Sequence, residues 1–218
     1  MSRRHRQPDH GLLTALFAVG DALHPPGPGR DEAVARFEQL FAEYGGPESF
    51  ANLSLPAAQT LLYTGWRIAM LRGEPGQAHA LAARFFTHPE ARRDREPVRD
   101  WLYEHTHHWM RYLWATAAYH CGDDSEAVSQ MGPLLERART PRQRDGLYMV
   151  RAFLLEWCDY RTRRGQAQNL PEGYAELAEE VVRLIMRRKS HRRHLPDAPE
   201  VADLRAFLTS TFPTSKAA

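Results

Sequence analysis

Residues 104–114 read EHTHHWMRYLW and bring together three histidines, a carboxylate and two tryptophans. Glu104 and His107 are three positions apart, so a helix would place the carboxylate and the imidazole on one face. Carboxylate-bridged di-iron bundles use this E-x-x-H spacing on two of their helices. The stretch therefore raises the hypothesis of a metal-dependent helical enzyme that uses the Glu104–His108 cluster.

The rest of the chain supplies no second pair of the same kind. The nearest match, Asp21-x-x-His24, begins with aspartate and adjoins a proline-rich segment. No H-E-x-x-H or paired-cysteine motif occurs, and Cys121 and Cys158 follow no metal-ligand spacing. Nucleophile, P-loop and dinucleotide-binding motifs are also absent from the sequence. We therefore predict no metal, no cofactor and no catalytic residue, and we interpret the histidines as rings that bond to neighbouring helices.

Two arginine-rich segments raise another alternative, a regulator that contacts nucleic acid. Residues 1–8 form a basic arm with Arg3, Arg4 and Arg6. The segment RRKSHRRH further along the chain carries Arg187, Arg188, Lys189, Arg192 and Arg193. Such clusters attract phosphate through the release of counterions. They are also typical of a solvated helix end, where cations complement the helix dipole.

Composition places the chain among folded proteins without a membrane span. The 218 residues are 43% hydrophobic and 26% charged, with a formal charge of +2, as in ordinary globular domains. No apolar run reaches the length of a membrane-spanning helix. The start, MSRRHR followed by GLLTALFAVG, resembles a secretory signal, but Asp9 as an N-cap and the helical spacing that follows favour an amphipathic helix. The expected location is the cytoplasm of a bacterial-type cell.

Helical patterning covers nearly the whole chain, and strand signals are almost absent. Proline and glycine clusters such as HPPGPG and YGGPES separate the helical stretches. The expected helices span residues 9–23, 30–44, 55–72, 75–87, 96–121, 123–138, 142–164, 172–188 and 198–210. This pattern predicts an all-α protein of about eight or nine helices, with one helical domain over 9–210 and a polar tail over 211–218.

The punctuation recurs along the chain. Three stretches each hold a glycine, a polar turn and then an alanine that begins an amphipathic helix: GRDEAVARFEQLF, RGEPGQAHALAARFF and CGDDSEAVSQMGPLL. These alanines, Ala33, Ala78 and Ala127, recur at intervals of about 45–50 residues, with a fainter copy at Ala175, and such a period is typical of stacked helical hairpins. A small residue lets two helices approach closely, and a bulky pair such as Phe85–Phe86 fills the groove to the next hairpin.

Two stretches of the chain are similar to tetratricopeptide repeats: WRIAMLRGEPGQAHALAARFFTHPE and WATAAYHCGDDSEAVSQMGPLLERARTP. Each has an aromatic residue on the first helix, a turn glycine, an alanine on the second helix and a closing proline: Trp66, Gly73, Ala78 and Pro89 in one, and Trp114, Gly122, Ala127 and Pro141 in the other. The spacing of about 45–50 residues between successive alanines is longer than the family's repeat period of about 34 residues. The resemblance covers residues 55–141 and implies an α-solenoid of stacked antiparallel hairpins.

Such a stack presents a groove lined by the first helix of each pair. The resemblance therefore implies a non-enzymatic adaptor or regulatory scaffold that binds a protein or peptide in the groove, with self-association as an alternative use of an apolar surface. Aromatic and arginine side chains anchor interfaces. The groove candidates of this kind are Tyr63, Trp66, Arg67, Trp101, His105, His108, Arg111 and Tyr112. Within 104–114 we expect Trp109 and Leu113 to pack inside, while His105, His108 and Tyr112 face the groove.

Overall fold

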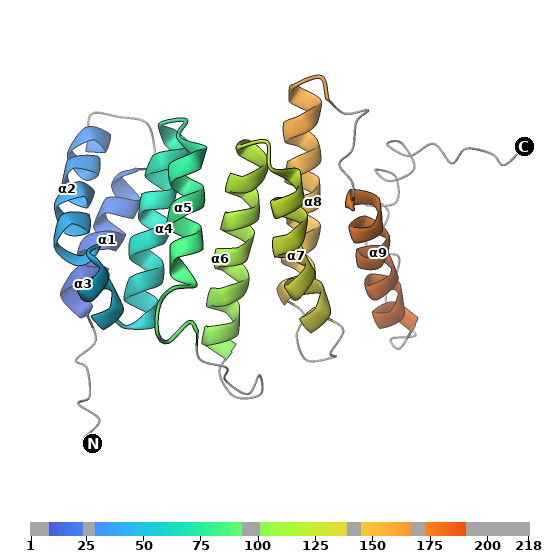
Figure 1. Ribbon diagram of the computed structural model, residues 1–218, viewed down its shortest axis with the longest axis horizontal. Helices are drawn as coiled ribbons and strands as arrows, with labels where there is room; N and C mark the ends of the chain where they lie inside the picture. Colours follow the sequence, from blue (N-terminus) through green and yellow to red (C-terminus); the bar gives the residue numbers. More distant parts are fainter. Residues whose placement is uncertain (1–8, 24–28, 93–100, 139–144, 167–172, 191–218) are drawn as a thin grey trace, which may run out of the picture. The chain divides into compact units, whose positions relative to one another are not determined.

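The computed structural model describes residues 9–23, 29–92, 101–138, 145–166 and 173–190, and for 101–105, 137–138, 145–146, 148, 182 and 185–190 it describes the backbone alone. These described residues form nine helices joined by turns, with no strand among them (Figure 1). The all-α prediction is therefore confirmed. The chain divides into two compact units within α6 (Trp101–His120): unit 1 is Met1–Ala117, and unit 2 is Ala118–Ala218.

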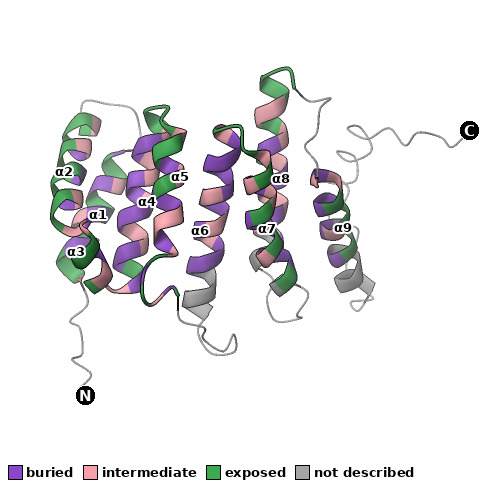
Figure 2. Cartoon of the chain, in the orientation of Figure 1, coloured by how far each residue is buried: buried purple, intermediate pink, exposed green. Residues whose placement is uncertain are grey.

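Unit 1 holds five complete helices and most of α6. They are α1 (His10–Ala22), α2 (Gly29–Tyr44), α3 (Pro47–Asn52), α4 (Leu55–Leu71) and α5 (Pro75–Phe85). The central element is α4, which packs against α1, α2 and α5 and is buried along much of its length (Figure 2). Its side chains Leu61 and Leu62 are fully enclosed, so the apolar core of unit 1 is built around this helix.

The start of α4 is held by hydrogen bonds from two directions. Ser54 is the N-cap, and its hydroxyl accepts the Ala57 N–H at 3.4 Å. Pro56 suits the first turn, where a missing N–H costs nothing. Asp9 occupies the N-cap position of α1 as expected, but its carboxylate makes no capping bond there and instead accepts the Ser54 N–H at 2.9 Å. The predicted cap of α1 is thus a link between the starts of α1 and α4.

The short helix α3 has no counterpart among the predicted helices. It begins at Pro47 after an extended Gly46, and proline is well suited to a first helical position. A helix of six residues is too short for hydrophobic periodicity to reveal. The predicted helix over 198–210 lies outside the described residues, as does the 96–100 portion of the helix predicted over 96–121.

Three helices end in the same left-handed glycine turn. The helices are α4, α6 and α8 (Asp145–Arg163), and the glycines are Gly73, Gly122 and Gly165, with φ of 72°, 84° and 69°. At the end of α4 the Gly73 N–H donates to Met70 at 3.1 Å and the Glu74 N–H donates to Ala69 at 2.9 Å. This pair of bonds is the Schellman motif, which satisfies the last carbonyls of a helix. The repeat pattern predicted the turns at Gly73 and Gly122 but missed the one at Gly165, because a longer connection follows it.

The glycine requirement of this turn can be measured. Replacing Gly73 with alanine should lower the free energy of unfolding by roughly 1–2 kcal/mol, because a Cβ destabilises the left-handed conformation. Gly76, in the first turn of α5, is the matched control: a Cβ at either position meets nothing within 4 Å. Gly76→Ala should be neutral or stabilising by up to about 1 kcal/mol. Urea unfolding of both variants tests this, and equal effects at the two sites would contradict it.

Unit 2 holds the end of α6, α7 (Asp124–Ala138), α8 and α9 (Tyr174–Ser190). Within it α8 packs against both α7 and α9, and α7 also contacts α9. Trp157 and Phe153 of α8 are fully buried, as is Tyr174 at the start of α9. The Tyr174 hydroxyl also donates to the Leu154 carbonyl at 2.9 Å. Because these three rings are fully buried, the aromatic side chains of α8 and α9 form the centre of this unit.

The repeat alanines are buried, as the pattern predicts, in three of the four sequence repeats. Ala33 of α2, Ala78 of α5 and Ala127 of α7 are all buried. In the faint fourth copy Ala175 is only half-buried, and Ala178, one turn later on α9, is the enclosed small residue. The predicted register of that copy is therefore wrong by one helical turn, which is consistent with the longer connection before α9.

Candidate functional site

A continuous cluster of rings and one guanidinium joins α4 to α6 in unit 1. The Tyr63 and Trp109 rings meet edge to face with centroids 5.9 Å apart, and Trp109 stacks on Tyr112 at 5.4 Å with an interplanar angle of 13°. The Arg67 guanidinium lies over the Tyr63 ring at 5.7 Å. Tyr63, Arg67 and Trp109 are half-buried, whereas Tyr112 is almost covered. The cluster therefore offers the edges of large side chains to solvent while its base is fixed by packing.

The cluster continues onto α1 through Arg67. Its Nη1 donates to the Gly20 carbonyl at 3.2 Å. Phe17 is one turn before Gly20, on the same side of α1, and its side chain is 59% exposed. Phe17 therefore adds an exposed apolar ring on the helix to which Arg67 is bonded. We call Phe17, Tyr63, Arg67, Trp109 and Tyr112 the aromatic surface.

Arg67 also has unused hydrogen-bonding capacity. Its second terminal nitrogen, Nη2, is buried and has no hydrogen-bond partner among the described residues. A buried donor without a partner costs roughly 1–3 kcal/mol. Because this nitrogen is enclosed by the protein, the Arg67 guanidinium contributes to the surface through its contact with the Tyr63 ring.

Three of the predicted groove residues lie elsewhere in unit 1. Trp66 donates its Nε1 hydrogen to the Leu113 carbonyl at 3.0 Å and packs on the enclosed alanines of α4, α5 and α6. Arg111 lies over the Phe86 ring of α5 at 4.8 Å. His108 is 4% exposed and belongs to the interior. These side chains hold helices together and do not line the aromatic surface.

The histidine-rich stretch forms packing contacts where its side chains are described. His107 Nε2 lies 3.0 Å from the Ala91 carbonyl oxygen, and its ring meets Phe85 and Phe86 edge to face at 5.2 and 5.8 Å. Among the described residues, no group of three or more His, Cys, Asp or Glu side chains is arranged to hold a metal ion. The side chains of Glu104 and His105 lie outside the described part of the structure.

Several other predicted residues also lie outside the described side chains. The backbone of Trp101 and His105 belongs to α6, and that of Arg187, Arg188 and Lys189 to the end of α9. Arg192 and Arg193 lie outside the described residues altogether. The nucleic-acid hypothesis therefore stays a prediction from the sequence.

Sequence reasoning missed two members of the aromatic surface. Phe17 was not among the groove candidates, and Trp109 was expected inside. The available signal for Phe17 is its position next to Leu16, because adjacent residues of an amphipathic helix point about 100° apart and only one can face the core centre. No local signal distinguishes Trp109, since both stripes of α6 are aromatic.

Unit 2 contains polar contacts that join its helices. Asp124, in the first turn of α7, accepts the Trp157 Nε1 hydrogen at 3.1 Å and an Arg161 Nη1 hydrogen at 2.7 Å.

Burial, reinforced by a nearby aspartate, raises the pKa of both thiols, Cys121 and Cys158. These thiols are protonated at neutral pH, a state in which cysteine is a poor nucleophile.

Comparison of the chain with protein-family models, with curated proteins and with solved structures found no match. The class of protein is therefore defined by its own fold and surface: an all-α chain whose first unit displays the aromatic surface. Among the described helices, none combines the length and the apolar character that a membrane span requires.

Proposed function

We propose that the protein is a non-enzymatic adaptor or regulator, built as a tetratricopeptide-like stack of helical hairpins, that binds a peptide segment of another protein on the aromatic surface. The observation that carries this proposal is the continuous contact from Arg67 through Tyr63 and Trp109 to Tyr112. Tyrosine, tryptophan and arginine are the residue types that dominate binding energy at protein interfaces.

The environment of these side chains also suits recognition. Rings that pack on each other are already ordered, so binding costs little further side-chain entropy. Phe17 exposes an apolar ring to water, and covering it would contribute by the hydrophobic effect. The half-buried Arg67 guanidinium adds a positive charge that suits an acidic side chain of the peptide. The surface thus combines apolar anchors with one positive charge.

The supporting evidence for a repeat architecture is the recurring turn geometry. The hairpin α4–α5 follows a Schellman turn at Gly73, and the same motif recurs at Gly122 and Gly165. The buried alanines on α2, α5 and α7 add a second recurring feature. In a stack of this kind the first helices of successive hairpins share one face, and α1 and α4 are in contact.

The proposal is tested by affinity capture with the full chain from the cells that make it, with captured proteins quantified by mass spectrometry. Phe17→Ala and Trp109→Ala should each lower recovery of a specific partner about tenfold or more, as expected for anchor residues. Arg36→Ala is the control, because Arg36 is exposed on α2 and its Nη1 donates to Gln39 of the same helix; it should leave recovery unchanged.

Two outcomes would contradict the proposal. Equal recovery with all three variants would show that the aromatic surface takes no part in binding. Recovery that disappears after nuclease treatment would favour the nucleic-acid alternative.

A further inference from the structure

A second region of unit 1 has the features of a small-molecule site. A pocket of about 470 Å³ lies between α3 and the end of α5. It is lined by Pro47, Phe50, Ala51, Arg84, Thr87 and Pro89, together with the backbone at Gly45. This volume falls within the range of about 300–1,000 Å³ that is usual for ligand pockets. Of these described lining residues, Arg84 alone carries a charge.

The Arg84 guanidinium is held in place by three groups. It lies over the Phe50 ring at 4.9 Å and near the Phe41 ring at 5.8 Å. One of its terminal nitrogens, Nη2, donates to the Gly45 carbonyl. Stacking on aromatic faces and a hydrogen bond to the backbone fix the direction of the remaining N–H groups. The guanidinium is therefore pre-organised before any ligand arrives.

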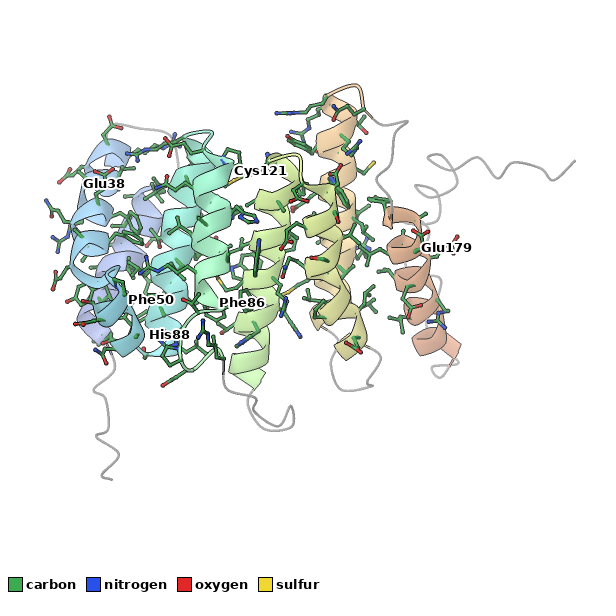
Figure 3. All side chains as sticks on the ribbon, viewed as in Figure 1. Glu38, Phe50, Phe86, His88, Cys121 and Glu179 are labelled. Atoms are coloured by element: carbon green, nitrogen blue, oxygen red, sulfur yellow. The ribbon has the colours of Figure 1, made fainter. Side chains whose placement is uncertain are left out.

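The Phe50 wall of the pocket is fixed from behind by His88. The two rings meet edge to face at 5.3 Å, and Figure 3 shows them side by side. The Glu90 N–H donates to His88 Nδ1 at 3.2 Å, so the ring hydrogen is on Nε2, which donates to the Leu53 carbonyl at 3.2 Å. These bonds fix the His88 ring, which packs edge to face against the Phe50 ring on which Arg84 stacks.

Within the part of the chain that the structure describes, Arg84 has no carboxylate partner of the kind that a half-buried cation normally has. No carboxylate of the described residues lies within ion-pair distance of it, and its bonds go to one carbonyl and two rings. The Arg84 side chain is only half-buried and lines the pocket. Burial lowers the pKa of Arg84 below its ordinary value, which is the sign of a cation with incomplete solvation.

We propose that this pocket binds a small monocarboxylate with an apolar body, whose carboxylate pairs with Arg84 and whose body rests against Phe50, Ala51 and the prolines. A guanidinium presents parallel N–H donors that match the two oxygens of a carboxylate. A single cation neutralises one negative charge, and the remaining lining is apolar except for Thr87 and the Gly45 backbone, so a dianionic phosphate fits less well. The site shares no residue with the aromatic surface and is independent of the proposed function.

Nuclear magnetic resonance titration of the full chain with phenylacetate tests the proposal. We expect saturable shifts at the amides of Gly45 and Thr87. Phenylacetamide, which has the same shape without the charge, should bind about tenfold or more weakly. Inorganic phosphate should also bind more weakly than phenylacetate, because it lacks the apolar body.

Two variants and a control locate the site. Arg84→Gln should weaken phenylacetate binding about tenfold or more. Arg36→Gln removes the same charge from an exposed position on α2, where Arg36 Nη1 donates to Gln39 Oε1, and should change binding by less than about twofold. Ala51→Leu keeps Arg84 but fills the pocket, and should also abolish the amide shifts. It decides the question if Arg84→Gln does not fold.

Three results would overturn the proposal. They are an absence of saturable binding of phenylacetate to the wild-type chain, binding of phosphate as tight as that of phenylacetate, and unchanged binding in Ala51→Leu.

Discussion

Replacing Phe85 with alanine should lower the free energy of unfolding by about 4 kcal/mol, the largest loss that we expect in unit 1. Phe85 is fully buried at the end of α5. Its ring contacts Phe86 and His107, each with centroids 5.2 Å apart. The alanine would leave a cavity and remove the ring against which His107 packs. Stability is then lost both because less apolar surface is buried and because the cavity itself is unfavourable. Urea unfolding followed by far-ultraviolet circular dichroism measures the loss.

Phe17→Ala is the matched control, since it deletes the same atoms from an exposed position. The Phe17 side chain is 59% exposed, so its loss should change stability by less than about 0.5 kcal/mol. The same variant should lose partner binding if the aromatic surface is the binding site. A large destabilisation by Phe17→Ala would mean that this ring is part of the core, and would remove it from the aromatic surface.

Replacing Trp157 with alanine should destabilise unit 2 by about 4 kcal/mol. The indole is fully buried and lies 5.2 Å from both the Phe153 and Tyr174 rings. Its Nε1 hydrogen bonds to Asp124 at 3.1 Å. The alanine therefore empties the centre of the unit and removes a hydrogen bond from a half-buried carboxylate. The same unfolding experiment measures the change.

Trp157→Phe separates these two contributions. The phenyl ring keeps most of the apolar volume but cannot donate to Asp124, which retains its bond from Arg161 at 2.7 Å. We expect a loss of about 1–2 kcal/mol from the missing charge-assisted hydrogen bond and the smaller ring. A loss equal to that of Trp157→Ala would show that the hydrogen bond, and not the packing, dominates at this position.

The helices themselves were largely predictable from the sequence. The stretch predicted over 55–72 is α4 (Leu55–Leu71), and that over 123–138 is α7 (Asp124–Ala138). Hydrophobic periodicity, prolines in the first turn and glycines after the last turn are local signals, so they act through residues close in the chain. The short helix α3 escaped because it spans less than two helical turns.

The candidate site was predictable only in part. Tyr63, Arg67 and Tyr112 were named from their residue types, and the structure brings them together. His108 was assigned to the surface and lies inside, whereas Trp109 was assigned to the interior and lies half-exposed. The carboxylate pocket at Arg84 had no sequence signal, because its walls come from α3 and from residues on both sides of the α5 end.

The sequence by itself determined the all-α class, most helix positions and the recurring glycine turns, because each depends on contacts within one or two turns of chain. Tertiary structure alone decided which aromatic residues line the pocket, which belong to the aromatic surface and which are buried in the core. Residues 104–114 hold aromatic side chains on every face of the helix, so their periodicity cannot select an exposed one. Phe85 and Phe86 of the α5 segment cover His107, and Tyr63 of α4 meets Trp109 edge to face. These neighbours lie far away in sequence, and their positions, not the residue types of the stretch, determine which ring reaches solvent.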